Sequence, residues 1–409
     1  MAKYPVTKPY FTDEEIMLIS DSLKSGWVAQ GPKVTEFEKQ VAVHEGIKEG
    51  VATTSCTTAL FLAMVAQGLG EGMDAIAPAF TFVATTNAIV MTGATPVLCD
   101  IHRETFNIDV DLLSSIIEHK YVKKDGKLIN IDSGNILWGI VPVHEFGLCC
   151  DIYEINNIAQ KYGLQVIEDA ACALGARIGE THQGGFGNTS CVSFHPRKSI
   201  TTGEGGMIMT DDAKLAIRMR ELRNHGSTVS ADARDKGKGF LLPEFNEAGY
   251  NYRMTDVQGA MGLAQIKKLD FIINEKRKCA SVYNDLISRI LPEFIVPTEP
   301  KEYFHTYQSY VCMINMDYLK LDSIKLGGEY RNILLQRLED LGIATRQGTH
   351  AIHMLGYYKN RFGYEANDYK NAYACDHLSI TLPLYIGITL EDQEHIIRTI
   401  RNTMDEIKR

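Results

Sequence analysis

The sequence has little of what a membrane-spanning or secreted protein needs. Its 409 residues contain no stretch of about eighteen uncharged apolar residues, so no membrane-spanning helix and no membrane partner are expected. Residues 1–15 show no apolar core with a small-residue cleavage site, so no signal peptide is expected. The nine cysteines are odd in number and scattered through apolar runs, which predicts buried, reduced thiols rather than a disulfide framework. These absences predict a cytoplasmic protein.

The chain also lacks an excess of positive charge. Its 51 Asp and Glu residues outnumber 42 Lys and Arg residues, and the formal net charge is −9. Nucleic-acid phosphates require a basic face, so no nucleic-acid partner is expected. Any anionic ligand must therefore be bound by donors gathered locally. The remaining composition, 45% hydrophobic and 23% charged, is ordinary for a globular protein.

Strands and helices alternate through the first part of the chain. A capping box at Thr12 predicts a helix that ends at Gly26. The βαβ rhythm that follows predicts an α/β fold with a largely parallel sheet and helices on its faces. The predicted strands cover residues 50–54, 75–78, 96–99, 136–143 and 164–167, and the predicted helices cover residues 57–69, 82–91, 109–119 and 152–162.

The rest of the chain departs from this rhythm. The polar segment 120–135 is expected to be a surface excursion, and residues 307–316 alternate as an antiparallel strand would. A chain of this length fits one large and one smaller domain, and we place the boundary near residue 250. The further predicted helices begin near Asp211 and Thr255, cover residues 324–341, and begin at Thr389.

Three segments place polar residues where a ligand of an open α/β sheet would bind. Asp169 follows an apolar strand, and Lys198 lies in a loop after the apolar run 191–194. Residues 53–58 (TTSCTT) carry mostly small hydroxyl side chains and lie at the N-terminus of a predicted helix. Because such ligands gather at the carboxyl ends of strands, the three segments are expected to meet at one site.

Together these segments can form a site for pyridoxal 5′-phosphate (PLP). A helix N-terminus offers free N–H groups to a phosphate, and a desolvated Lys198 can be neutral enough to form a Schiff base. A buried Asp169 facing the pyridine nitrogen would keep it protonated and make the ring an electron sink. Spacing alone leaves the alternatives open, because a lone Asp after a strand is more often a helix cap and a lone loop Lys is usually solvated.

Seven segments, in order along the chain, resemble the nucleotide-sugar aminotransferases of the DegT/DnrJ group, which are fold-type-I PLP enzymes. The resemblance runs from about residue 4 to the C-terminus. It implies a large domain, residues 1–250, with a mostly parallel seven-stranded sheet flanked by helices, and a smaller α+β domain, residues 251–409. The segments are GWVAQGP (26–32), SCTTAL (55–60), PAFTFVAT (78–85), PVHEFG (142–147), IEDAACALGA (167–176), SFHPRKSITTGEGG (193–206) and GYNYRMTDVQGAMGLAQIKKLD (249–270).

The resemblance implies a role for each residue that matches a family position. Lys198 would be the Schiff-base lysine, Asp169 the partner of the pyridinium and Phe82 the ring that stacks on the cofactor. Asn251 would reach the phosphate of the second subunit, which implies a homodimer with active sites at the subunit interface; a cap before the next helix is the alternative for Asn251. The remaining phosphate ligands would be Cys56, Thr57 and Ser193.

One position departs from the family pattern. The family usually has Gln or His where this chain has Cys172, at a place that approaches the phenolic oxygen of the cofactor. A thiol is a weak donor. Either a water or a neighbouring side chain replaces it, or the proton affinity of the cofactor is tuned differently.

Two further residues are candidates for binding substrate. His350 lies in a segment, residues 346–358, that the family would place near the substrate, and a structural loop histidine is the alternative. Arg253 could bind a nucleotide diphosphate, or could form an ordinary surface ion pair. The spacing of His350 and His353 does not support a metal site, so no metal is expected.

The resemblance implies transfer of an amino group from L-glutamate to a nucleotide-linked keto sugar, in amino-sugar and polysaccharide biosynthesis. Residues 195–204 resemble members acting at C4 of a 4-keto-6-deoxyhexose, whereas members acting at C3 follow the lysine with Asn-Leu-Gly and carry Asp in place of Glu204. Amination at C3 or of a keto-cyclitol is the alternative. A PLP-dependent sugar dehydratase would have His in place of Lys198, and a cofactor-free binding or regulatory protein would not need both Lys198 and Asp169.

Overall fold

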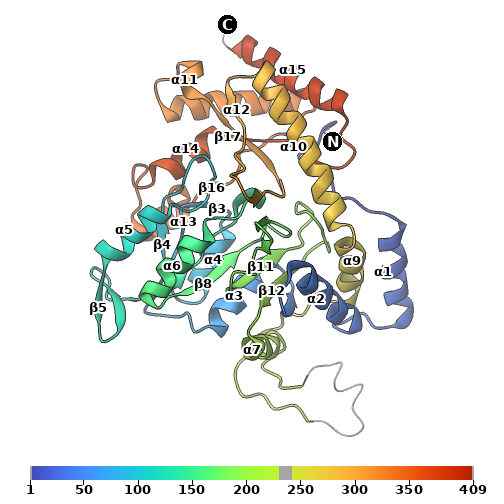
Figure 1. The fold of residues 1–409 in the computed structure, drawn as a ribbon, viewed down its shortest axis with the longest axis vertical. Coiled ribbons are helices and arrows are strands. Elements are labelled where there is room, and N and C mark those ends of the chain that lie inside the picture. The colour runs from blue at the N-terminus through green and yellow to red at the C-terminus, as the bar shows by residue number, and fades with distance from the viewer. Residues whose placement is uncertain (1, 230–241, 408–409) are drawn as a thin grey trace.

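A central sheet and a smaller C-terminal layer make up the fold (Figure 1). The computed structural model describes residues 2–229 and 242–407. Within the central sheet the four pairings from β11 to β4 are parallel, and β12 runs antiparallel to both of its neighbours. The seven strands, in spatial order, are β1 (Glu49–Thr53), β12 (Gly206–Thr210), β11 (Thr189–Ser193), β8 (Gln165–Asp169), β7 (Ile136–Ile140), β2 (Met73–Pro78) and β4 (Thr95–Cys99).

Both faces of this sheet are buried, as the near-continuous apolar runs of its strands predict. Successive residues of β12 show this, because Met207 and Met209 join one apolar cluster and Ile208 joins the other. The first cluster includes side chains from α2 (Pro32–Glu45), α5 (Val110–Lys120) and α6 (Ile152–Tyr162). The second includes side chains from α3 (Cys56–Ala66), α4 (Ala84–Met91) and α7 (Ala213–Arg223).

The segment 120–135 is largely exposed, as the predicted surface excursion would be, and it forms a β-hairpin that extends the sheet to nine strands. Its strands β5 (Tyr121–Lys124) and β6 (Lys127–Asn130) pair with each other, and β6 pairs with β7. Some of its polar residues bind the buried Asp74 carboxylate. The Tyr121 hydroxyl donates to it at 2.9 Å and the Asn130 amide at 2.7 Å.

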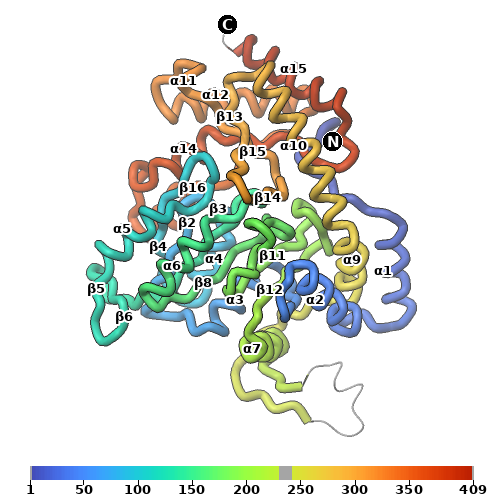
Figure 2. Tube along the Cα trace, in the orientation of Figure 1, coloured from blue at the N-terminus to red at the C-terminus, as the bar shows by residue number. Residues whose placement is uncertain are grey.

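The C-terminal part is an antiparallel sheet covered by helices. Its apolar core also contains Tyr4, whose ring lies 5.7 Å from that of His395, so the N-terminal residues lie beside the last helix (Figure 2). The sheet consists of β13 (Phe294–Ile295), β15 (Tyr310–Ile314) and β17 (Ser379–Leu382). The helices that contribute to its core are α10 (Leu269–Ile290), α12 (Ile324–Asp340), α14 (Lys370–Leu378) and α15 (Leu390–Ile407).

Two capped helices connect the parts. Thr12 caps α1 (Asp13–Ser25) and Thr255 caps α9 (Asp256–Ile266), both through capping boxes as the sequence predicts. α9 packs against α1 and α2, and α10 then leads into the C-terminal core. The domain boundary near residue 250 stays a prediction. The remaining elements are β3 (Phe80–Thr81), η1 (Glu145–Gly147), β9 (Arg177–Ile178), β10 (Thr181–His182), β14 (Tyr303–Phe304), α11 (Met316–Leu319), β16 (His350–Ala351), η2 (Ile352–Met354) and α13 (Gly356–Phe362).

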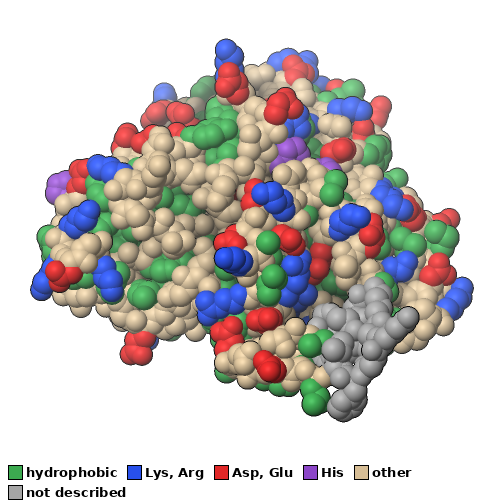
Figure 3. Space-filling view, turned by 60° about the horizontal axis from the view of Figure 1, so that its bottom comes forward, with side chains coloured by type: hydrophobic (Ala, Val, Ile, Leu, Met, Phe, Trp, Pro, Cys, Tyr) green, Lys and Arg blue, Asp and Glu red, His purple; other side chains and the backbone are tan. Residues whose placement is uncertain are grey.

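The surface fits the composition. On the face shown in Figure 3, basic and acidic side chains are interspersed rather than gathered by sign. None of the helices in the described residues combines the length and apolar character needed to cross a membrane. All nine cysteines are free thiols, and seven of them are buried, as predicted.

Candidate active site

The three segments singled out in the sequence meet at one cavity of about 420 Å³. β8 ends at Asp169, β11 ends at Ser193, and α3 begins at Cys56, so the cavity lies at the carboxyl ends of the parallel strands. The residues of the sequence prediction that line it are Cys56, Thr57, Phe82, Asp169, Cys172, Ser193 and Lys198.

The start of α3 lies directly against β12 because position 206 is glycine. A Cβ atom at Gly206 would lie 2.4 Å from the carbonyl carbon of Ser55, so any side chain there would displace the helix start. The Ser55 hydroxyl caps the helix by accepting the Thr58 N–H at 3.2 Å. The N–H groups of the first turn thus form part of the wall of the cavity, where they can bind a phosphate.

Lys198 lies in a loop, residues 194–205, that leaves β11 and returns to β12 beside it. The two ends of this loop are joined, since the Phe194 N–H donates to the Gly205 carbonyl at 2.9 Å. The Lys198 Nζ donates to the Cys172 Sγ at 3.0 Å. Burial acts to lower the pKa of Lys198, whereas its interactions with Cys172, including the hydrogen bond, and the negative charge of Asp169 raise it, and the pKa lies above its ordinary value.

Asp169 is a buried carboxylate with fixed oxygens. Its Oδ2 accepts the Thr85 hydroxyl at 2.7 Å, and its Oδ1 accepts the Ala171 N–H at 3.0 Å. Burial raises its pKa, although both hydrogen bonds and the charge of Lys198 oppose this shift. No Lys, Arg or His of the described residues forms an ion pair with Asp169, so its carboxylate is placed to receive a cation that enters the cavity.

A second, outer cavity of about 400 Å³ opens onto the first. The two share Phe82, Cys172 and Lys198. Phe82 precedes α4 rather than beginning a helix, and its side chain is 62% exposed, so it is not a core residue. It is free to stack on a planar ligand between the two cavities.

The outer cavity brings together two guanidinium groups that the sequence prediction missed. Arg197 and Arg346 both line it, and within the described part of the chain neither forms an ion pair with a carboxylate. Burial lowers the pKa of Arg197, and the nearby positive charge of Arg346 lowers it further. Two unpaired cations at one cavity suit an anionic ligand. They are the locally gathered donors that a chain of net negative charge needs to bind an anion.

Three predicted site residues do not line either cavity. Asn251 is exposed and pairs with Asn224 in an isolated β-bridge, and Thr255 rather than Asn251 caps the next helix. Arg253 donates to the Asn224 side chain at 2.7 Å. The ring of His350 lies 2.8 Å from Gln347, which does line the outer cavity.

The residues that the prediction missed stand in or beside segments that the sequence had already singled out, although their places in the cavities depend on the fold. Thr85, Glu145, Arg197 and Arg346 lie inside or directly at the edge of segments already singled out for their resemblance. Adjacency to Lys198 was the available signal for Arg197. Glu145 gave the signal of an acidic residue directly after a strongly apolar strand.

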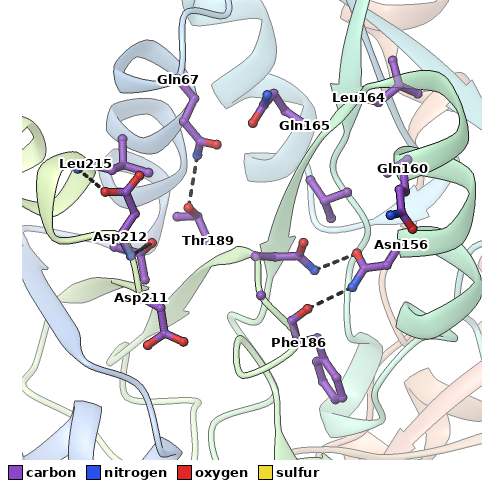
Figure 4. A pocket seen from close by; sticks show the side chains of 15 residues that line it. Gln67, Asn156, Gln160, Leu164, Gln165, Phe186, Thr189, Asp211, Asp212 and Leu215 are labelled. Carbon is purple, nitrogen blue, oxygen red and sulfur yellow. Dashed lines mark hydrogen bonds between the residues drawn. The ribbon is translucent and has the colours of Figure 1, made fainter.

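Other polar clusters are better explained without a ligand. A cavity of about 470 Å³ lies at the opposite end of the strands, where the Gln67 amide donates to Thr189 at 3.3 Å (Figure 4). None of the described residues that line it is a Lys, His or Cys. His44, Glu45 and His182 come within metal-binding distance of one another. However, hydrogen bonds and charges of Glu45 and Asp270 overcome burial and raise the pKa of His44 to about 9, so its ring is protonated and opposes a metal ion.

The inner cavity fits PLP. Lys198 supplies an amine, the start of α3 with Ser193 supplies donors for a phosphate, and Phe82 supplies an aromatic face. The buried Asp169 carboxylate, which has no cation partner among the described residues, matches a protonated pyridine nitrogen.

Comparisons with known proteins agree with this geometry. The family model described as the DegT/DnrJ/EryC1/StrS aminotransferase family matches residues 9–401. The spore coat polysaccharide biosynthesis protein SpsC of Bacillus subtilis is 34% identical over 398 residues, covering 97% of this chain and 96% of SpsC. The UDP-4-amino-4-deoxy-L-arabinose--oxoglutarate aminotransferase of Shewanella sediminis is 30% identical over 400 residues, covering 97% of each chain. The PMP form of Spr1654 from Streptococcus pneumoniae is 26% identical, with a TM-score of 0.86 over 98% of this chain and 99% of that one.

Proposed function

Since this chain belongs to the DegT/DnrJ/EryC1/StrS aminotransferase family and is a PLP-dependent sugar aminotransferase, we propose that it transfers an amino group from L-glutamate to C4 of a nucleotide-linked 4-keto-6-deoxyhexose. The observation that carries this proposal is the arrangement of the two cavities. Lys198 and Asp169 lie in the inner one, and Arg197 and Arg346 lie where an anionic substrate would enter.

The roles of the cavity residues follow from their positions. We propose that Lys198 binds PLP covalently, that Asp169 binds the ring nitrogen, and that Cys56, Thr57 and Ser193 bind the phosphate. PLP supplies the electron sink that stabilises a carbanion next to the amino group. With PLP and the donor bound in the cavity that Lys198 lines, its amine would hold and move the proton at the donor's Cα.

The two guanidinium groups support an anionic donor and an anionic acceptor. Glutamate carries two carboxylates, and a nucleotide-linked sugar carries a diphosphate, and both classes are bound well by the planar guanidinium fork. We propose that Arg197 and Arg346 bind these groups in turn, as the two substrates occupy the outer cavity one after the other. Arg253 and His350 are proposed to contact the sugar nucleotide only at the edge of this cavity.

Two observations favour C4 over C3. The residues that follow the lysine, Ser199-Ile200-Thr201, resemble the members acting at C4, and Glu204 lines the inner cavity at the position where members acting at C3 carry Asp. The Shewanella sediminis relative is named for a 4-amino sugar and for oxoglutarate, the keto acid that glutamate leaves. Amination of C3 or of a keto-cyclitol is the second candidate.

A substrate panel tests this assignment. Purified enzyme with PLP and L-glutamate is expected to convert nucleotide-linked 4-keto-6-deoxyhexoses and to release 2-oxoglutarate, with the aminated carbon located by NMR. The matching 3-keto compounds are the control, and they are expected to react at least about tenfold more slowly, a difference of about 1.4 kcal/mol in transition-state binding. Conversion of the 3-keto compound alone would contradict amination at C4 but leave the aminotransferase activity intact.

We further propose that the active unit is a homodimer in which Asn251 completes the site of the other subunit. Asn251 is exposed and lines neither cavity of its own chain, although its segment adjoins the start of α3, where the Thr54 N–H donates to the Tyr252 carbonyl at 3.1 Å. An exposed amide beside a phosphate-binding helix start is suited to reach across a two-fold axis.

Mixing two inactive variants tests the shared site. Lys198→Ala subunits and Asn251→Ala subunits are each expected to be nearly inactive alone, and their heterodimer to recover up to about half of the wild-type activity per dimer, because one site then keeps both residues. Activity should be measured after subunit exchange is verified with differently tagged chains. Verified heterodimers without recovery would place Asn251 in its own subunit's site or outside the reaction.

A further inference from the structure

Glu145 is a buried carboxyl group at the end of the strand beside β8. It follows β7 in the short helix η1, and its side chain is only 4% exposed. It lines both the inner and the outer cavity. Its Oε1 has no hydrogen-bond partner among the described residues. A buried polar atom without a partner at the wall of a ligand cavity indicates that the ligand supplies the partner.

The surroundings of Glu145 keep its proton on. Burial is the main cause that raises its pKa to about 8, and the charge of Asp169 adds to it, while a hydrogen bond with Thr81 and the charge of Lys198 oppose it. At neutral pH Glu145 is therefore a neutral acid with an O–H donor, unlike an ionised carboxylate, which can only accept. The other titratable groups on the walls of its cavities are Cys56, Glu104, Cys172, His195, Arg197, Glu204, His305 and Arg346.

Cys172 lines the same two cavities as Glu145 and replaces a strong hydrogen-bond donor of the family with a weak one. It stands at the position that approaches the phenolic oxygen of the cofactor, where the resemblance places an amide or an imidazole. Burial raises the pKa of the Cys172 thiol, and its sulfur already accepts the Lys198 Nζ at 3.0 Å. A thiol is by its nature a weak hydrogen-bond donor. Both Glu145 and Cys172 line the two cavities, so a group near Cys172 is within the same space as Glu145.

We propose that Glu145 donates the hydrogen bond to the phenolic oxygen of PLP that Cys172 cannot supply, an assignment that rests on the proposed function. This makes Glu145 a catalytic residue by contact with the cofactor. Its effect should be measurable on the nitrogen that joins Lys198 to PLP. When that nitrogen loses its proton, negative charge on the neighbouring oxygen is no longer compensated, and a donor at the oxygen stabilises this form. The donor therefore lowers the proton affinity of the nitrogen.

The test is a pH titration of the visible absorbance of the PLP-loaded protein without substrate. Glu145→Leu is expected to raise the pKa of the linking nitrogen by about one unit, the size of one net hydrogen bond. Glu145→Gln keeps an N–H donor and is expected to titrate close to wild type. Adding Cys172→Gln to Glu145→Leu restores a donor and is expected to move the pKa back. Glu204→Leu is the matched control, since it removes another carboxyl group from the wall of the same cavity and should leave the pKa unchanged.

The outcomes separate this assignment from the proposed function. Protein that forms the Lys198 link but shows no shift in Glu145→Leu, or the same shift in Glu204→Leu, overturns the role of Glu145 alone. Absence of any link in wild type overturns the proposed function and this role together. If Glu145→Leu does not fold, the stability of cofactor-free wild type is compared with that of cofactor-free Glu145→Gln across pH. The free energy of unfolding of wild type should fall relative to that of Glu145→Gln as the pH rises from 4.5 to about 8, because in this range Glu145 keeps its proton only in the folded state. If the two curves of unfolding free energy against pH are parallel, Glu145 is not protonated in the folded state and the proposal is overturned.

Discussion

Replacing Lys198 with alanine is expected to give a colourless protein whose turnover falls by about 10⁴-fold or more. The loss is large because one side chain has two proposed duties, the covalent link to PLP and the transfer of the proton at Cα. Among the residues that the structure describes, no other lysine lines either cavity, so none of them places a second amine to replace it. Absorbance, borohydride reduction followed by peptide mapping, and single-turnover kinetics with glutamate measure the two losses separately.

Lys276 is the matched control for this prediction. It is buried near Lys198, and burial lowers its pKa to about 8, so by proton affinity alone it would be the better Schiff-base lysine. However, its Nζ donates to the Gln308 carbonyl at 3.2 Å, and it does not line the cavities. Lys276→Met is expected to keep the reducible link at Lys198. A link that survives in Lys198→Ala and disappears in Lys276→Met would show that the assignment is wrong.

Replacing Asp169 with asparagine is expected to leave PLP bound but to lower turnover by at least about 10²-fold. A charge-assisted hydrogen bond is worth about 1.5–3 kcal/mol, which is about 10- to 150-fold, and loss of the pyridinium proton weakens the electron sink further. Thr85→Val is the graded comparison. It removes only the hydroxyl that donates to Asp169 at 2.7 Å and should lower turnover by less than about tenfold. Near-normal turnover in Asp169→Asn would contradict the pairing with the pyridine nitrogen.

The same variant should change how the cofactor-free protein responds to pH. Burial raises the pKa of Asp169 above its ordinary value, so the folded state holds the proton to higher pH than the unfolded state does. The corresponding stability is present at low pH and lost as the pH rises through the folded-state pKa. Urea unfolding curves of cofactor-free Asp169→Asn should therefore show a flatter pH dependence than those of wild type over that range.

Much of the inner cavity could be predicted because its residues stand at strand ends. Apolar runs mark the strands, and parallel strands bring their carboxyl ends to one edge, so Asp169, Ser193 and Lys198 had to lie close together. Phe82 was named from the family resemblance instead, and the helix after it begins only at Ala84. The pairing of β5 and β6 was missed because most of the hairpin is exposed and polar, and only Tyr121 and Asn130 turn inward to bind the buried Asp74.

The outer cavity could not be predicted in the same way. Arg346 comes from a segment far along the chain, and only the packing of the C-terminal layer brings it beside Arg197. The pKa of Lys198 also could not be predicted from the residues that adjoin it in the sequence. Burial and the charges of its neighbours act in opposite directions, and their balance depends on distances that only the folded chain defines. For Asn251, the missing information is the arrangement of a second subunit.

The loop of residues 194–205, whose ends are hydrogen-bonded to each other, limits how far Lys198 can move between its two proposed duties. Its ends are joined between adjacent antiparallel strands, and the Thr202 N–H also donates to the Phe194 carbonyl at 3.0 Å. From the other side, the Gln308 side chain donates to the Arg197 carbonyl at 2.6 Å. When the lysine amine is released, only its side-chain torsions are therefore free to change, while the Cα stays in place. The amine then has only a few side-chain rotamers to sample before it meets the reacting carbon. Its effective molarity is therefore far above that of any amine in solution.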